Sequence, residues 1–154
     1  MAQFRKIAFG LTLGLGLVAF GGAAIAQEEA IEARKAGMKV YGASMGAIKK
    51  VVDANGPASD AVAPAEAIAA QAAKELVHFV PGSDKPQGKE KGQTRAKPEI
   101  WANFAEFEKL MGNLRTAAEK TAADAKAGNI DLVKGDFGAM GGACGACHKQ
   151  FRND

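Results

Sequence analysis

The chain has 154 residues, of which 47% are hydrophobic, and it carries 20 lysines and arginines against 17 aspartates and glutamates. This length suits one domain with a single hydrophobic core. The positive excess is small, and no basic segment is interleaved with aromatic residues, so nothing in the sequence supports nucleic-acid binding. Cysteine and histidine each occur only twice, which makes their positions informative.

The amino terminus has the pattern of a secretory signal peptide. Arg5 and Lys6 precede an apolar run over residues 7–20, and an Ala-Ile-Ala cleavage site follows. The run is short for a membrane anchor, and two glycines interrupt the sequence after it. We therefore expect residues 1–26 to be removed and residues 27–154 to form one mature domain in the periplasm. That domain would have a net charge of about +1 and no membrane attachment.

Two amphipathic helices are predicted in the first half of the mature chain. Residues 28–53 carry apolar side chains at intervals of three, four and seven, namely Ile31, Met38, Tyr41, Met45, Ile48 and Val52. Residues 60–80 form the second helix, with Ser59 or Asp60 as its cap and Pro64 in its first turn. Alanine dominates the apolar face of this second helix, so neighbouring helices can approach it closely.

Residues 81–97 are polar, rich in glycine and lysine, and without any periodic pattern. This composition predicts a long loop. A loop of this length in a small domain is usually functional or disordered. We expect its tip, residues 84–91, to be solvated and mobile.

Two more helices are predicted after the loop. Residues 98–127 lie between Pro98, which suits a first helical position, and Gly128. The last helix begins near Asn129 and repeats apolar residues at intervals of three and four, namely Ile130, Val133, Phe137, Met140, Cys144, Cys147 and Phe151. Four such helices, with two short connections and one long one, predict an all-α, antiparallel four-helix bundle.

The last eleven residues contain Cys144-Gly-Ala-Cys147-His148, the attachment sequence of a c-type haem. Two thiols three positions apart on a helix point the same way and can add to the two vinyl groups of one porphyrin. The histidine follows at once and is placed as an axial ligand of the iron. Because both cysteines lie on the apolar face, we predict one covalent haem c in the core. Four glycines of this helix are expected to let the ring approach the backbone, namely Gly138, Gly141, Gly142 and Gly145.

Two haem-free alternatives stay open. A Cys-x-x-Cys sequence can be a thiol–disulfide site, but such sites usually open a helix after a strand, and no segment before Cys144 has a strand pattern. A zinc site built on Cys144, Cys147 and His148 would need a fourth ligand. Only His78 remains for that role, and no second ligand stands beside it in the sequence.

The sequence resembles cytochrome c′, a family of class II c-type cytochromes. Three segments carry the resemblance: the carboxy-terminal Cys-x-x-Cys-His followed by Phe151-Arg152, the sequence ARKAGMK at residues 33–39, and TRAKPEIW at residues 94–101. The order of these motifs and of the helices agrees over the whole mature chain. The resemblance implies that Cys144 and Cys147 carry the haem. It also implies that His148 is the proximal ligand, with Arg152 beside it.

The resemblance implies further haem contacts on the other side of the cavity. Arg34 and Lys35 match haem-edge positions of the first helix, where Arg34 could pair with a propionate. Thr94 and Arg95 match the haem-contacting end of the long loop. Met38 matches the position that faces the iron from the distal side, as packing or as a sixth ligand. A methionine on a helical stripe is more often packing than a ligand.

Met38 separates two kinds of function. If its sulfur leaves the iron free, the haem is five-coordinate and high-spin, and a pocket without a hydrogen-bond donor admits small uncharged ligands such as NO or CO. If the sulfur binds, the haem is six-coordinate and low-spin, which suits electron transfer alone. The motifs favour the first state. We expect no enzymatic activity, because no catalytic constellation is present. The resemblance also implies a homodimer packed through the first two helices, whereas the redox partner protein cannot be predicted.

Overall fold

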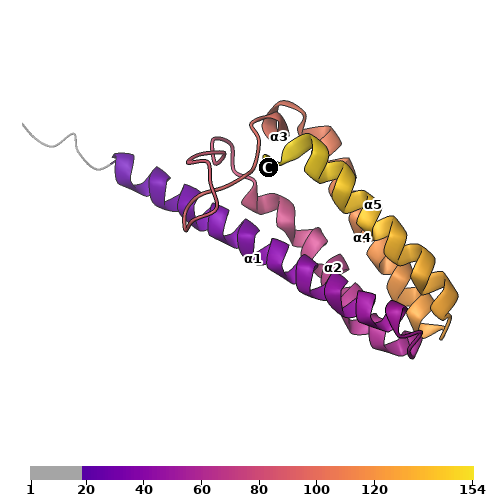
Figure 1. Cartoon of the computed structure of the whole chain (residues 1–154). Helices are drawn as coiled ribbons and strands as arrows, with labels where there is room; N and C mark the ends of the chain where they lie inside the picture. Colours follow the sequence, from indigo (N-terminus) through magenta and orange to yellow (C-terminus); the bar gives the residue numbers. More distant parts are fainter. Residues whose placement is uncertain (1–18) are drawn as a thin grey trace, which may run out of the picture.

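The computed structural model describes residues 19–154 and is built almost entirely from helices (Figure 1). The four long helices are α1 (Ala19–Asp53), α2 (Val62–Glu75), α4 (Phe104–Lys126) and α5 (Ile130–Phe151). Short helical turns connect them, namely η1 (Ala58–Ala61), η2 (Leu76–His78) and α3 (Glu99–Ala102). The predicted all-α four-helix bundle is confirmed. Most of the predicted signal peptide, residues 1–18, lies outside the described residues, and α1 runs without a break past residue 26.

The helices pack as a ring in the order α1, α2, α4 and α5, and α5 closes the ring against α1 with fewer contacts. Figure 1 shows α1 and α5 close together at the end with the short connections and diverging toward the end that carries the long loop and the C-terminus. The fully buried side chains at the closed end come from all four long helices, namely Ile48, Ile68, Ala118 and Val133. The apolar core therefore fills the closed end and leaves the other end open to a cavity.

The ends of α4 and α5 form where the sequence predicts them. Gly128 adopts a left-handed conformation (φ +75°) directly after α4, which glycine tolerates without strain. Asn129 caps α5, because its side-chain oxygen accepts a hydrogen bond from the Leu132 backbone N–H at 3.1 Å. This cap sets the start of the helix, and its register determines which face carries the two cysteines.

The predicted second helix is shortened, and the predicted third helix is interrupted. The α-helical part of the second spans only Val62–Glu75, and η1 and η2 flank it as tighter turns. The third is divided at Asn103, whose non-helical backbone (φ −129°, ψ 46°) ends α3 and precedes α4. The division shifts the apolar face, so that Ile100 and Phe107 are both buried while Phe104 is exposed. The prediction of one helix over 98–127 was wrong, because apolar spacing alone does not reveal a single non-helical residue.

The long loop is held against α1. The side-chain oxygen of Glu32 accepts a hydrogen bond from the Gly92 backbone N–H at 2.8 Å, and Lys35 donates to the Glu90 carbonyl at 2.8 Å. Lys91 also forms an ion pair with Glu28 at 3.3 Å. The tip is largely exposed, as predicted, but these contacts tie its end to the bundle. The loop therefore forms part of the wall at the open end.

Candidate haem site

A cavity of about 610 Å³ lies at the open end, between α1 on one side and α5 on the other. Its size falls in the range of small-molecule and cofactor sites. The cavity wall includes every residue for which the sequence predicts a haem contact, namely Arg34, Lys35, Met38, Thr94, Arg95, Cys144, Cys147, His148 and Arg152. Residues from three separate segments of the chain, namely α1, the long loop and the end of α5, are thus brought to one place.

Aromatic side chains form a packed floor beneath this cavity. The rings of Phe79 and Phe107 have centroids 4.5 Å apart, and Phe107 meets Phe151 edge-on at 5.3 Å. All three are buried, and they come from the loop, α4 and α5. Such tilted and edge-on pairs are favourable arrangements of aromatic rings. The floor therefore gives the cavity a fixed apolar surface that suits a flat apolar ring.

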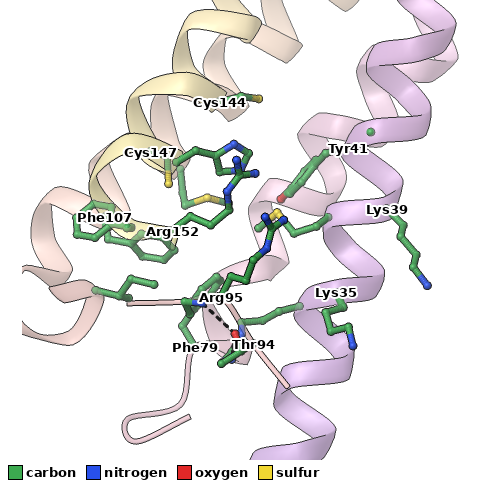
Figure 2. Close-up of a pocket in the computed structure, with 18 of the residues that line it drawn as sticks. Lys35, Lys39, Tyr41, Phe79, Thr94, Arg95, Phe107, Cys144, Cys147 and Arg152 are labelled. Carbon is green, nitrogen blue, oxygen red and sulfur yellow. Dashed lines mark hydrogen bonds between the residues drawn. The ribbon is translucent and has the colours of Figure 1, made fainter. Parts of the chain in front are cut away.

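Cys144 and Cys147 lie on the α5 side of the cavity, one turn apart (Figure 2). Both thiols are free and half-buried, and burial raises the pKa of each, to about 11 for Cys147. Redox-active Cys-x-x-Cys pairs depend on a lowered thiol pKa, so this environment is unlike theirs. The cavity is not lined by the four glycines expected to let the ring approach the backbone, so that prediction was wrong; they are Gly138, Gly141, Gly142 and Gly145. They lie on the outer face of the helix.

His148 also lines the cavity, directly after the second cysteine. Burial lowers the pKa of its imidazole, and the positive charges of Arg152 and Arg95 lower it further. The neutral imidazole is the form that binds a metal ion. Within residues 19–154, no cluster of three or more His, Cys, Asp or Glu side chains could hold a metal ion by itself. The histidine is therefore suited to be one ligand of an iron whose other ligands come from a porphyrin.

The chain end is tied to the end of the long loop. Ala96 and Arg152 form an antiparallel bridge, the Lys97 N–H donates to the Phe151 carbonyl at 3.0 Å, and the Asn153 N–H donates to the Arg95 carbonyl at 2.8 Å. These bonds place Arg95 and Arg152 on the same part of the cavity wall (Figure 2). Both arginines therefore lie near His148, as their effect on its pKa requires.

Arg34 is buried and links α1 to both ends of the long loop. Its guanidinium donates to the His78 carbonyl at 3.0 Å and to the Ser83 side chain and carbonyl at 2.5 and 2.6 Å. A longer bond of 3.3 Å reaches the Thr94 hydroxyl. The charge also lies 5.0 Å from the centre of the Phe79 ring. Both terminal nitrogens of Arg34 thus already donate hydrogen bonds to the protein. The predicted contact between Arg34 and a haem propionate would therefore use the Nε–H or replace one of these bonds.

The remaining predicted residues lie at the edge of the cavity. Lys35 pairs with Glu32 at 3.0 Å. The hydroxyl of Thr94 accepts a hydrogen bond from the Ala96 N–H at 3.1 Å. Met38 lines the wall from α1 but keeps 39% of its surface exposed. Each position is compatible with its predicted haem contact, which stays a prediction.

Sequence reasoning missed two buried polar groups beside the cavity. Tyr41 was assigned only to an apolar stripe, yet its hydroxyl has no hydrogen-bond partner among the described residues. Glu75 of α2 is fully buried, and one of its carboxylate oxygens also lacks a partner there. The spacing offered a signal for Glu75, because it lies three residues after Ala72 and four before Phe79, and both of these apolar residues are buried.

The cavity fits the haem that the attachment motif implies. Two thiols and a neutral imidazole lie on one wall, and apolar side chains cover the interior. Cationic side chains also line the cavity, namely Lys35, Lys39, Arg95 and Arg152. Apolar walls suit the porphyrin ring, and cations suit its two carboxylates. Cys144, Cys147 and His148 would hold the group.

Comparison with known proteins agrees with this geometry. The family model for cytochrome c′ matches residues 29–152. The cytochrome c′ of Allochromatium vinosum is 36% identical over 143 residues, which covers 92% of this chain and 91% of that protein. The crystal structure of cytochrome c′ from Thermochromatium tepidum is 39% identical with a TM-score of 0.76, covering 83% of this chain and 97% of that one.

A more distant solved structure, a variant of cytochrome c′ from Alcaligenes xylosoxidans, is 28% identical with a TM-score of 0.71 and covers 83% of this chain and 96% of that one. Sequence, fold and the residues of the cavity thus lead to one assignment. The chain belongs to the cytochrome c′ family of c-type cytochromes, which carry one covalently attached haem c.

Proposed function

We propose that this protein is exported to the periplasm, where it exchanges electrons and binds NO or CO at a five-coordinate, high-spin haem iron. The haem, when bound, supplies the iron that changes oxidation state and takes the small ligand. The chain supplies His148 as the proximal ligand, the two thioether links, and a cavity that limits what can enter. We assign binding and electron exchange to this site and no catalytic turnover.

The observation that carries the proposal is the contrast between the two walls of the cavity. His148 extends from α5, whereas α1 offers no histidine on the opposite side. The only other histidine, His78, does not line the cavity, and its carbonyl accepts a hydrogen bond from Arg34. Met38 and Met45 are the two methionines of α1 that line the cavity, and Met38 is at the position that the resemblance places opposite the iron. The partial exposure of Met38 argues against a sulfur that packing holds in place.

A related protein supports the choice of ligand. The Alcaligenes xylosoxidans variant was solved as its nitric oxide complex. The matching fold favours the same class of ligand here. The alternative is a six-coordinate His/Met cytochrome that acts purely in electron transfer, and the place of Met38 on the cavity wall is the observation in its favour.

The visible absorption spectrum of the mature haem protein, oxidised and then reduced, separates the two proposals. Broad, unsplit bands that change when CO or NO is added are expected for the vacant position. Sharp, split bands on reduction, unaffected by CO, would contradict that proposal and make Met38 a ligand. A colourless protein, made in a host that attaches haem, would exclude both.

Export and assembly are proposed on separate grounds. The signal-peptide pattern of residues 1–26 supports export, and none of the helices within residues 19–154 has the length and apolar composition of a membrane span. Purification from the periplasm with Gln27 as the first residue would test it.

We also propose a homodimer that packs through the first two helices. The exposed Val40 on α1 and Val77 after α2 support it. A solved cytochrome c′ that is 36% identical shows a ligand-controlled dimer dissociation. Sedimentation of the haem protein with and without CO tests this assembly, and a monomer at all concentrations would contradict it.

A further inference from the structure

Positive charge gathers on the wall of the cavity, although the charges of the chain are almost balanced. Residues 27–154 carry 18 lysines and arginines against 17 aspartates and glutamates. Six of these basic residues line the cavity, and no acidic residue of the described part of the chain does. The rest of residues 27–154 then has 12 basic against 17 acidic side chains, so the cavity wall is positive and the remainder is negative. The six are Arg34, Lys35, Lys39, Lys89, Arg95 and Arg152.

Four of these cationic side chains form no ion pair within residues 19–154, namely Lys39, Lys89, Arg95 and Arg152. They come from α1, the long loop and the end of the chain, and Lys39 and Lys89 are exposed. Figure 2 shows Arg95 and Arg152 between α1 and α5, and Lys39 extending outward from α1. Like charges repel, so a cluster without counter-charges favours contact with a negative partner.

The haem would balance only part of this charge. A haem c brings two carboxylates, whereas six cationic side chains line the wall. Arg34 is buried and Lys35 is paired with Glu32, so the four cations without an ion pair are those best placed to meet another molecule. A positive surplus therefore remains around the cavity where electrons would enter or leave.

We propose that Lys39, Lys89, Arg95 and Arg152 form a docking surface for an acidic protein that exchanges electrons with the haem. This inference rests on the proposed function, because it names the kind of partner that the electron-exchange site would meet. Complementary charge speeds the encounter of two proteins and selects their relative orientation. A protein with its redox centre beneath an acidic face would be drawn to the cavity and away from the negative remainder of the domain.

The rate of electron exchange with a small charged reagent tests the field of this surface. Ferricyanide is the anionic probe, because it takes one electron from the reduced haem iron and becomes ferrocyanide. Stopped-flow rates would be compared for the wild type, Lys39→Glu, Lys89→Glu and Lys50→Glu, after the absorption spectrum of each has given its haem content. Lys50 is the matched control, since it is exposed on the same helix as Lys39 but does not line the cavity. All three substitutions change the net charge equally.

The expected result is a loss of rate that depends on position and on salt. At low ionic strength, Lys39→Glu and Lys89→Glu should each slow the reaction by about threefold or more, whereas Lys50→Glu should stay close to the wild-type rate. The rates should converge in about 1 M salt, which screens charges beyond roughly 3 Å. Tris(phenanthroline)cobalt(III), a cationic oxidant, should react faster with Lys39→Glu and Lys89→Glu than with the wild type.

Poly-glutamate extends the test from a small ion to an acidic polypeptide. It should slow the ferricyanide reaction of the wild type by covering the surface, and should slow a Lys39→Glu/Lys89→Glu double variant much less. Monomeric glutamate at the same concentration of charge is the control for ionic strength. Vesicles of phosphatidylglycerol are tested by co-sedimentation with the haem protein. If the vesicles bind and poly-glutamate has no effect, the surface meets a membrane, and the proposal of a protein partner is overturned.

The outcomes separate this inference from the proposed function. If the wild type exchanges electrons at a rate that neither salt nor Lys39→Glu changes, electron exchange stands and the docking surface is overturned. Equal losses in Lys39→Glu and Lys50→Glu would show that net charge alone acts, which also overturns it. If the reduced haem protein gives electrons to neither oxidant, the proposed electron exchange fails, and the inference fails with it.

Discussion

The carboxylate of Glu75 on α2 occupies the space in which a side chain at Gly37 of α1 would begin. A Cβ atom added at Gly37 would lie 2.1 Å from Glu75 Oε2, far inside van der Waals contact. Gln71 donates its side-chain N–H to that same oxygen, and Glu75 is fully buried. The close approach of α1 and α2 therefore depends on Gly37, because a glycine leaves room for the Glu75 carboxylate.

This contact predicts a coupled effect of two substitutions. Gly37→Ala should lower the free energy of unfolding by about 1–2 kcal/mol, because the buried carboxylate must move, although alanine favours a helix. In a Glu75→Ala background, the same substitution should be neutral or stabilise by up to about 1 kcal/mol, the helix preference of alanine over glycine. Urea unfolding of the four proteins measures the coupling. Equal effects of Gly37→Ala in both backgrounds would show that the contact carries no energy.

The same buried acid predicts a pH dependence. Burial raises the pKa of Glu75 above its ordinary value of 4.5, although Gln71 and nearby positive charges, of which His78 and Arg34 are the largest, act against the rise. The folded protein then holds the proton more tightly than the unfolded chain. The stability from this group is fully present below pH 4.5 and is lost as the pH rises through the raised pKa.

Glu75→Gln removes this titration while keeping a side chain of similar size. The free energy of unfolding of the variant, minus that of the wild type, should therefore increase as the pH is raised from 4.5 toward neutrality. Urea unfolding at several pH values measures the difference. A constant difference across that window would mean that Glu75 has the same pKa in the folded and unfolded chain.

Covalent attachment gives a direct test of the two cysteines. Cys144→Ser and Cys147→Ser should each weaken haem retention, because one thioether link is lost, and the double variant should lose it altogether. Haem staining after denaturing electrophoresis detects only covalent haem, and is therefore the measurement. An unchanged stain in the double variant would refute the attachment.

Sequence periodicity predicted the cysteine face of α5 and its start, because both depend on local features. The intervals of three and four residues reach Cys144 and Cys147 from Val133, and Asn129 is a good cap whatever surrounds it. The family resemblance identified the positions of the cavity. These predictions needed no information on how distant segments meet.

Features that depend on distant contacts could not be predicted. Ser83 lies in a polar loop with no pattern, and only the folded chain brings it to Arg34, 49 positions away. The break at Asn103 turns Phe104 out of the apolar face that Ile100 and Phe107 share, and the regular spacing of the three residues gives no sign of it. Tyr41 fits an apolar stripe by spacing, so the isolation of its hydroxyl appears only when its surroundings are known.

Arg34 is predicted to stabilise the open end of the bundle. Arg34→Ala removes its hydrogen bonds to the loop, including those to the hydroxyl and the carbonyl of the fully buried Ser83, so the free energy of unfolding should fall by about 2–4 kcal/mol. Arg115→Ala is the matched control, because its ion pair with Glu119 is exposed, and it should change stability by less than about 0.5 kcal/mol. If Arg34→Ala and Arg115→Ala lower the free energy of unfolding by the same small amount, the loop contacts of Arg34 contribute nothing to stability.

Met38 governs entry to the distal side of the cavity in the five-coordinate proposal. Met38→Ala shortens a half-exposed side chain on that wall, which should enlarge the pocket and speed the binding of CO and NO several-fold. Val40→Ala is the control, since Val40 lies on the same helix with similar exposure but does not line the cavity. Flash photolysis of the CO complex and stopped-flow mixing with NO give the rates.

The absorption spectrum of Met38→Ala distinguishes a gate from a ligand. If Met38 only covers the iron, the variant keeps the broad bands of the wild type and differs in rate alone. If its sulfur is the sixth ligand, the wild type has sharp bands that the variant loses, and CO binds only after the substitution. Rates and spectra that are both unchanged would mean that Met38 does not face the iron, and that another part of the α1 wall controls ligand entry.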